Sequence, residues 1–244
     1  MHHHILVACV EILLPFSEIA KFYGAYYHVD GVQALGNMKL NVNELGIDLL
    51  SISSHKIHGP KGAGALFVRE NVKINKFMVG GEQEMNKRGG TVNVPAIVGF
   101  GKAVELNERD FPLKEKKLYE LTSYFTKKIE YEIPDIKING NKNQKSLSIV
   151  SVTFEGVEGE NLIMLLDMKG IAASTGSACA SGSLEKSHVL AAMGLSDQEI
   201  RGTIRFSFDI NITKDDIDYV VRVLCEEVAK LRKASPLKQK KKEN

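Results

Sequence analysis

Hydrophobic positions along the chain follow two different spacings. Short apolar runs bounded by polar or turn-forming residues are typical of strands, and they occur at residues 25–29, 48–53, 64–68, 136–138, 147–154 and 204–208. Apolar positions that recur every three or four residues predict helices, at residues 16–23, 95–109, 113–129, 158–168 and 184–193 and in the segment that follows Asn211 or Thr213. Strands that alternate with helices predict an α/β fold with a mainly parallel sheet, in which ligands bind at the strand ends.

The helical pattern that begins at Pro95 is interrupted at Asp110-Phe111-Pro112. Because proline inside a helix removes a hydrogen bond and usually breaks or kinks the helix, we expect a helix end there. The same break predicts a domain boundary, with one α/β domain over residues 1–109 and a smaller α/β domain over residues 110–236. The lysine-rich residues 237–244 are expected to form a disordered basic tail.

The charge of the chain gives little indication of a partner. There are 32 Lys and Arg residues against 30 Asp and Glu residues, a net charge of +2, which offers no argument for nucleic-acid binding. The excess lies in the tail, where solvated disorder is the simple interpretation and docking to an acidic partner is the alternative. The apolar run at residues 5–14 contains Glu11 and is far shorter than the roughly 20 residues that cross a bilayer, so neither a signal peptide nor membrane association is expected. The opening Met1-His2-His3-His4 is compatible with the remainder of a tag or with a shifted reading frame.

The three cysteines, Cys9, Cys179 and Cys225, are widely separated and lack the Cys/His spacing of a metal site, so we predict no bound metal. In the absence of a secretory signal, the expected compartment is the reducing cytoplasm. Cys225 shares an apolar helix stripe with Val221 and Leu224, and we expect it to be a packed core thiol.

Cys179 lies in a run of small hydroxyl-bearing and glycine residues, Ser174–Gly182. This composition is typical of an exposed loop, because such residues cannot build a packed core. Reactive cysteines are accessible in polar surroundings, whereas structural cysteines lie among apolar neighbours. The loop alone therefore leaves two interpretations open, a nucleophilic thiol and an ordinary surface cysteine.

A second candidate site lies at the ends of two predicted strands. The strand at 48–53 continues into Ser53-Ser54-His55-Lys56 and a turn at 59–62, and the strand at 25–29 continues into Asp30. A lysine at a strand end is suited to forming a Schiff base. Pyridoxal 5'-phosphate (PLP) needs such a lysine and a carboxylate against its ring nitrogen. Taken separately, Lys56 is better explained as a solvated lysine and Asp30 as a helix cap, but their order along the chain favours one shared site.

Four segments carry a resemblance to a known family: His28–Gly36, Ser51–Phe67, Gly80–Gly99 and Ser174–Arg205. They resemble cysteine desulfurases of the NifS/IscS kind, which are PLP-dependent enzymes of fold type I within the class-V aminotransferase family. The resemblance implies an incomplete aspartate aminotransferase-like large domain over residues 1–109, together with the small domain that carries the Cys loop. It also implies that L-cysteine is the substrate and that sulfur is passed to an acceptor or iron–sulfur scaffold protein.

The resemblance assigns the cofactor site by position. Lys56 is expected to be the Schiff-base lysine and the acid/base that moves the Cα proton. Asp30 is expected to pair with the pyridine nitrogen and Gln33 to reach the ring hydroxyl, while Ser53 and His55 hold the phosphate.

The remaining roles are also implied by the resemblance. Thr91 is expected to reach the phosphate of the neighbouring subunit, which implies a homodimer. Arg205 is expected to clamp the substrate carboxylate, a task suited to its planar bidentate guanidinium. Cys179, as a thiolate, is expected to attack the substrate sulfur and carry it as a persulfide.

The front of the chain departs from the family pattern. Members of the family have roughly four hundred residues, and the N-terminal helix, the phosphate-cupping loop and the histidine that stacks on the ring have no counterpart here. The Asn-Asn-Glu-Ile-Gly segment of the family is replaced by Ala8–Leu14. We therefore expect an N-terminally truncated desulfurase that binds PLP weakly.

Three functions remain open from the sequence. The leading hypothesis is a cysteine desulfurase that yields L-alanine and a Cys179 persulfide. The second is a catalytically impaired remnant, or half of a split desulfurase that acts with another chain. The third is an ordinary class-V aminotransferase, which needs no cysteine at position 179.

Overall fold

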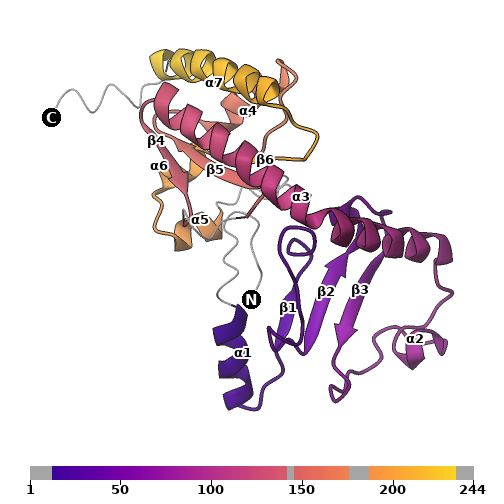
Figure 1. Ribbon diagram of the computed structural model, residues 1–244. Helices are drawn as coiled ribbons and strands as arrows, with labels where there is room; N and C mark the ends of the chain where they lie inside the picture. The colour runs from indigo at the N-terminus through magenta and orange to yellow at the C-terminus, as the bar shows by residue number, and fades with distance from the viewer. Residues whose placement is uncertain (1–12, 142–145, 176–186, 235–244) are drawn as a thin grey trace. The chain divides into compact units, whose positions relative to one another are not determined.

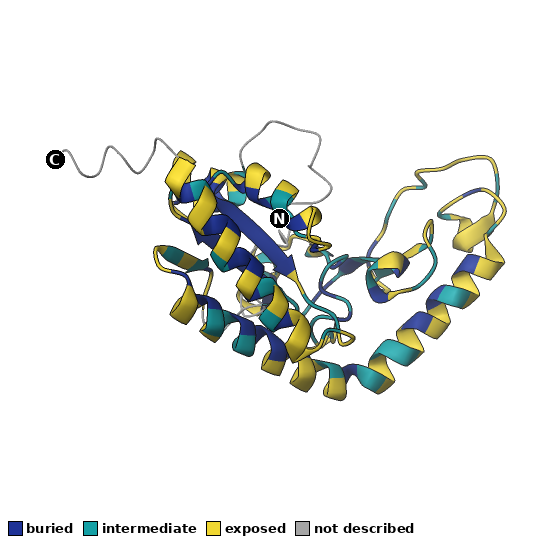
Figure 2. Cartoon of the chain, turned by 90° about the horizontal axis from the view of Figure 1, so that it is seen from above, coloured by how far each residue is buried: buried dark blue, intermediate teal, exposed yellow. Residues whose placement is uncertain are grey.

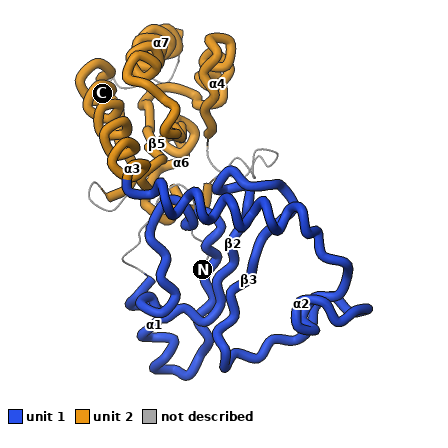
Figure 3. Tube along the Cα trace, turned by 45° about the vertical axis from the view of Figure 1, so that its right-hand side comes forward, with its two compact units in different colours: residues 1–3, 10–112 blue, residues 4–9, 113–244 orange. Residues whose placement is uncertain are grey.

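The computed structural model describes residues 13–141, 146–175 and 187–234 (Figure 1). Within these residues the chain divides into two compact units, residues 13–112 and residues 113–234 (Figure 3). Each unit has its own three-stranded sheet and its own helices. The fold is therefore of the α/β class, as the sequence predicts.

The sheet of the first unit has the order β1-β2-β3, with β2 between the two others (Figure 1). Strand β1 (His28–Asp30) pairs in parallel with β2 (Leu49–Ser53), and β2 pairs in antiparallel with β3 (Gly64–Val68). The described sheet is thus mixed, whereas the sequence predicted a mainly parallel one. The connection over residues 54–63 explains the antiparallel pair, because a parallel crossover needs about a dozen residues or more.

Two clusters of buried side chains hold the first unit together. Helix α1 (Leu13–Phe22) contributes Leu13 to the first cluster, which also contains Val29, Ile47 and Leu50. The second cluster joins the residues that follow β2 to helix α3, and its buried members are Ile57, Phe100 and Ala103. Both clusters contact the partly buried Ile52 of β2, so this strand is packed against both.

Helix α3 (Val94–Glu132) is continuous for 39 residues and contains Pro112. The predicted helix end at residues 110–112 is therefore wrong. The missing hydrogen bond at Pro112 is outweighed by packing, because Phe111 is buried and apolar positions continue at the helical spacing through Leu118, Leu121 and Phe125. Two short elements of the first unit were not predicted, the 3-10 turn η2 (Ser54–Ile57) and helix α2 (Gln83–Asn86).

The sheet of the second unit is antiparallel throughout, in the order β4-β5-β6. Its strands are β4 (Ile136–Asn139), β5 (Ile149–Phe154) and β6 (Thr203–Ser207). The helices of this unit, besides the second part of α3, are α4 (Gly159–Asp167), α5 (His188–Ala192), α6 (Asp197–Arg201) and α7 (Lys214–Ala234).

The core of the second unit lies between this sheet and its helices. Even-numbered positions of the strands, such as Val152 and Ile204, are fully buried against Phe125 of α3, Leu162 of α4 and Leu224 of α7. Strands β5 and β6 are buried at nearly every position (Figure 2), whereas β4 is buried only at Asn139. This alternation places the odd-numbered positions on the opposite face.

Helix α7 begins at the cap that the sequence predicts. The hydroxyl and N–H groups of Thr213 donate to the Asp216 carboxylate at 2.6 and 2.8 Å, and the N–H of Asp216 donates to the Thr213 hydroxyl at 3.2 Å. These bonds hold the pKa of Asp216 below its usual value. Cys225 is partly buried against the core, as predicted, and burial beside Glu132 raises the pKa of its thiol. Among the described helices, none is both long and apolar enough to cross a membrane.

Candidate cofactor site at two strand ends

The first two strands bring their carboxyl ends to the same edge of the sheet. Because β1 and β2 are parallel and Asp30 is the register partner of Ser51, Asp30 and Ser53 both lie at this edge. The chain turns immediately after Asp30, and the N–H of Gly31 donates to the Ser51 carbonyl at 2.8 Å. A Cβ on residue 31 would lie 2.5 Å from Cδ1 of Leu50, so a larger residue there would have to displace the Leu50 side chain.

Asp30 is partly buried, and its Oδ1 accepts a hydrogen bond from the N–H of Val32 at 3.0 Å. The carboxylate therefore stabilises the turn that follows β1, which agrees in part with the alternative view of Asp30 as a cap. Gln33 lies in this turn and is also partly buried, and its backbone carbonyl accepts from the Asn37 amide at 3.0 Å. The turn thus holds Asp30 and Gln33 close together at the strand end.

Lys56 follows β2 in a tight turn. Ser53 has extended backbone angles and ends the strand, and η2 then carries His55 and Lys56. The Ser53 hydroxyl and Nδ1 of His55 are hydrogen-bonded at 2.8 Å, so these two side chains form a polar pair. His55 is exposed and Lys56 is partly buried. The turn closes where His58 adopts a left-handed conformation and the N–H of Gly59 donates to the Ser54 carbonyl at 3.0 Å.

Thr91 lies elsewhere in the first unit, on the segment that leads into α3. It is exposed, and the N–H of the preceding Gly90 donates to Oε1 of Gln83 at 3.0 Å. The structure contains a single chain, so the expected contact of Thr91 with a neighbouring subunit stays a prediction.

Arg205 lies in the second unit, on β6, and is 9% exposed. It is the register partner of Ser151 on β5. On its other side, its backbone exchanges two hydrogen bonds with Ser174, at 2.6 and 3.2 Å. Ser174 and Thr175 are the last described residues before position 176, so the strand that carries Arg205 is joined to the start of the predicted Cys loop. Cys179 itself lies outside the described residues.

A row of buried polar side chains lies on the same face of the sheet as Arg205 and was not predicted from the sequence. The amide nitrogen of Asn139 donates to the hydroxyls of Ser151 and Thr153 at 3.2 and 2.9 Å, and the Thr153 and Thr203 hydroxyls lie 2.7 Å apart. Thr203 in turn donates to the Glu199 carbonyl at 2.7 Å. A signal was present, because residues 149–154 and 203–207 alternate between apolar and polar positions.

The groups at the edge of the first sheet fit PLP. They comprise the amine of Lys56, the carboxylate of Asp30, the amide of Gln33 and the hydrogen-bonded Ser53–His55 pair. An imine-forming amine, a partner for a ring nitrogen and donors for a phosphate are the groups that this cofactor requires. In the described part of the chain there is no group of three or more His, Cys, Asp or Glu residues that could hold a metal.

Comparison with known proteins places the chain in a family. The aminotransferase class-V family model matches residues 10–220, which is most of the sequence. The chain is a class-V aminotransferase family member. Enzymes of this family depend in general on PLP, which agrees with the groups found at the strand ends.

Two curated relatives of this class-V family member are cysteine desulfurases IscS. The protein from Dictyoglomus turgidum is 44% identical over 244 residues, which are 100% of this chain and 62% of the relative. The protein from Methanosarcina thermophila is 45% identical over 234 residues, which are 96% of this chain and 58% of the relative. The chain thus spans about three fifths of the length of these relatives.

Solved structures confirm the fold of this class-V family member. The NifS-like protein from Rickettsia africae superposes with a TM-score of 0.81 at 31% identity, covering 89% of this chain and 57% of the other. SspA, solved in complex with cysteine, gives a TM-score of 0.66 at 32% identity, covering 85% of this chain and 57% of the other. The predicted aspartate aminotransferase-like fold, with part of the large domain, is consistent with this coverage.

Proposed function

We propose that this chain acts as a PLP-dependent cysteine desulfurase, which removes sulfur from L-cysteine and leaves L-alanine and a persulfide on Cys179. The observation that carries the proposal is the parallel pairing of β1 with β2, which brings Asp30 to the same sheet edge as Ser53, His55 and Lys56. The names of the IscS relatives and the cysteine-bound SspA structure support the choice of substrate.

Each residue at the sheet edge has a part in this proposal. Lys56 would hold the cofactor covalently and would accept and return the proton at Cα of the substrate. Asp30 would pair with the ring nitrogen and Gln33 with the ring hydroxyl, while the Ser53–His55 pair would hold the phosphate. When bound, PLP supplies an electron sink for the bonds around the substrate Cα.

The second unit supplies the groups that act on the substrate. The guanidinium of Arg205 binds the substrate carboxylate through two parallel hydrogen bonds. The Cys179 thiolate attacks the substrate sulfur, and a sulfur–sulfur bond forms as the bond between Cβ and sulfur breaks. The electron pair of the broken bond remains on the carbon fragment, which takes up a proton and leaves as alanine.

The partners and domains complete the proposal. The chain forms a homodimer in which Thr91 reaches the phosphate of the neighbouring subunit, and an acceptor or iron–sulfur scaffold protein takes the persulfide sulfur. Residues 1–109 belong to the PLP-binding domain and residues 110–236 to the small domain.

The test starts with the cofactor. Purified protein is incubated with PLP, reduced with borohydride and digested, and the peptide that contains Lys56 should carry the pyridoxyl mass. Lys56→Arg should lose this mass, whereas replacement of the exposed Lys39 by Arg should not. If no lysine is labelled specifically, the proposed cofactor site is wrong.

Turnover then separates the alternatives. L-cysteine should yield alanine and an extra sulfur on the Cys179 peptide, and Cys179→Ser should retain PLP but lose sulfur transfer. Arg205→Lys should keep the fold and weaken cysteine binding, because one ammonium cannot replace a bidentate fork. Sulfide release at the parent rate by Cys179→Ser would contradict the desulfurase and favour other class-V chemistry. PLP binding without turnover in every variant would favour an impaired chain or one that needs a second polypeptide.

A further inference from the structure

The turn that carries Lys56 rests on one face of helix α3. Ile57, the residue after Lys56, is 3% exposed and packs with Phe100 and Ala103 of this helix. All of these residues belong to the first unit. Lys56 is thus separated from α3 by a single residue that is fully packed against it.

The residues that close this turn fit α3 only because it carries small side chains there. A Cβ on Gly99 would lie 2.6 Å from Cγ and 3.1 Å from Cδ of Pro60. A Cβ on Gly59 would lie 3.1 Å from Cβ of Ala103 and would overlap the Ser54 hydroxyl. Contacts under 3.0 Å essentially never occur between real side chains and those near 3.1 Å are rare, so the turn lies directly on the backbone of α3 at Gly99.

The same helix also receives the turn that follows Asp30. Gly36 has a φ of 82°, and a Cβ there would lie 2.7 Å from Cγ2 of Ile57 and 2.9 Å from Oδ1 of Asn107. Asn107 and Gly99 lie eight residues apart on α3, a spacing that places them on the same face of the helix. The segments after β1 and β2 therefore have a common support.

We infer that Gly99 is a positioning residue for Lys56. The inference rests on the proposed function, in which Lys56 has to meet Asp30 across the sheet edge. Proline fixes its own φ, and the bond from Gly59 N–H to the Ser54 carbonyl closes the turn, so a displacement of Pro60 moves the turn as a unit. Gly99 sets how closely this turn approaches α3 and so fixes where the Lys56 amine lies.

The chain offers a matched control on the same helix. Gly101 also lies in α3, but a Cβ there would meet nothing within 4 Å. Gly99→Ala and Gly101→Ala therefore make the same chemical change and the same gain in helix propensity, and differ only in the contact with Pro60. The primary measurement is the rate of reductive methylation of Lys56, mapped by mass spectrometry, with the exposed Lys39 of the same unit as internal reference.

We expect Gly99→Ala to raise the methylation rate of Lys56 relative to Lys39 at least threefold, because the turn is pushed away from α3. Gly101→Ala should leave this ratio within 1.5-fold of the parent, and the yield of pyridoxyl-Lys56 should fall at least tenfold in Gly99→Ala alone. These thresholds are on the order of 0.6 kcal/mol and 1.4 kcal/mol at 25 °C, by the conversion of tenfold to about 1.4 kcal/mol. The inference would be overturned if the ratio of Lys56 to Lys39 methylation rates were the same in the two folded alanine variants. It would also be overturned if the methylation rates of Lys39 and Lys56 rose equally, because that result indicates destabilisation of the whole unit.

A second variant covers the case in which Gly99→Ala does not fold. Pro60→Ala removes the ring atoms that face Gly99 without adding volume, and it should release Lys56 in the same way. In the double variant Gly99→Ala/Pro60→Ala the added methyl no longer meets the ring, so the Lys56 ratio should equal that of Pro60→Ala. If Pro60→Ala leaves the ratio at the parent value, the inference is wrong. The methylation rate needs no cofactor, so failure of the parent to take up PLP counts against the proposed function alone.

Discussion

Arg232 offers a stringent test of how the second unit is held together. Its side chain is buried near the end of α7, and the guanidinium donates to three backbone carbonyls, those of Glu155, Pro134 and Asp135, at 2.9, 2.8 and 2.8 Å. The first of these carbonyls follows β5 and the other two precede β4. One side chain therefore connects the last helix to the segments at the ends of two strands.

The expected loss follows from these three bonds. A hydrogen bond from a charged group contributes roughly 1.5–3 kcal/mol, so the three together set an upper range of about 4.5–9 kcal/mol. Two effects reduce this contribution to stability. Burial opposes the guanidinium charge and lowers the pKa of Arg232, and the three acceptor residues are exposed, so water can replace the donor. We expect Arg232→Leu to lower the free energy of unfolding by about 2–3 kcal/mol, or the Tm by about 4–12 °C for a chain of this size.

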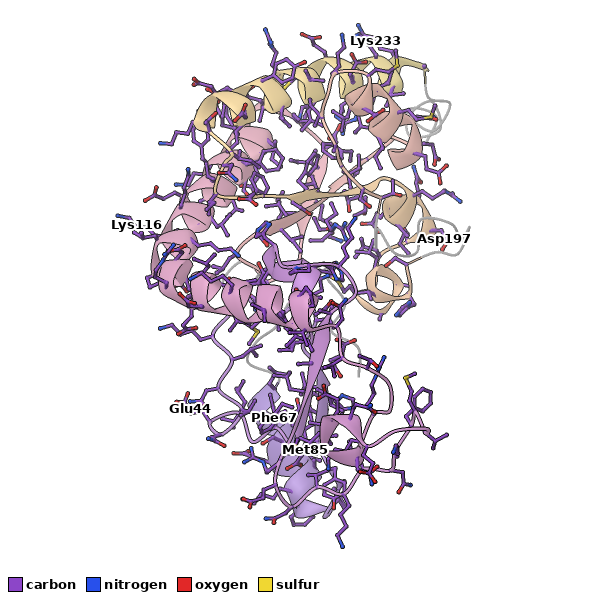
Figure 4. The ribbon with its side chains drawn as sticks, turned by 90° about the vertical axis from the view of Figure 1, so that its right-hand side faces the viewer. Glu44, Phe67, Met85, Lys116, Asp197 and Lys233 are labelled. Carbon is purple, nitrogen blue, oxygen red and sulfur yellow. The ribbon has the colours of Figure 1, made fainter. Side chains whose placement is uncertain are left out.

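Urea denaturation followed by circular dichroism measures this difference. Lys233→Leu is the control, because Lys233 is the next residue of α7 and is exposed (Figure 4). Arg232→Lys should retain part of the stability, since an ammonium can serve some of the carbonyls but lacks the planar arrangement of donors. A loss in Arg232→Leu within about 0.5 kcal/mol of that in Lys233→Leu would refute the reasoning, because surface substitutions commonly reach this size.

Three further predictions concern the second unit. Hydrogen bonds from Lys128 and Tyr124 hold the pKa of Asp218 below its usual value, so the stabilisation is present above its unfolded pKa of about 4 and is lost as the pH falls through the lower folded pKa. Asp218→Asn should therefore flatten the dependence of Tm on pH in this acidic window, and an unchanged slope would contradict the assignment. Phe125→Ala should cost about 3–5 kcal/mol in urea denaturation, because Phe125 is 1% exposed and its removal leaves a cavity. Cys225 should be alkylated more slowly than a free thiol at pH 7, because the raised pKa leaves little thiolate, and equal rates for Cys225 and a model peptide would exclude this explanation.

Strands and helices with strong local signals could be predicted closely from the sequence. Residues 64–68 were predicted as a strand and form β3, because a turn of glycine and proline directly precedes an apolar run. The same reasoning placed β2 within one residue. Strand β1 begins three residues later than predicted, at His28, since Ala25 and Tyr26 are exposed and have no strand partner in the described sheet.

Where the prediction failed, distant packing or a weak local signal was responsible. Pro112 is a correct local signal for a helix end, and it is overridden by the apolar positions that continue on both sides of it in α3. Helix α6 was missed although Ser196 and Glu199 form a capping box, because the helix has only five residues and little periodicity.

The functional groups of the candidate site could be predicted from the sequence, but the packing that positions them could not. Asp30 and Lys56 follow recognisable strand ends, so their grouping follows once β1 and β2 are taken as parallel. The contact between Pro60 and Gly99 joins residues that are 39 positions apart, and no local sequence pattern predicts it. The row from Asn139 to Thr203 likewise depends on strand pairing, since alternation shows which residues share a face but not which strand lies beside them.

Strand β3 has a practical consequence for the purified protein. Within the described residues it has a strand partner on one side only, and Gly64, Ala65 and Leu66 are exposed. Its sequence, Gly-Ala-Leu-Phe-Val, contains no charge and no proline, the two features with which proteins commonly block unwanted strand addition. We therefore expect edge-to-edge association of identical molecules through β3, with a tendency to aggregate that depends on backbone hydrogen bonding more than on net charge.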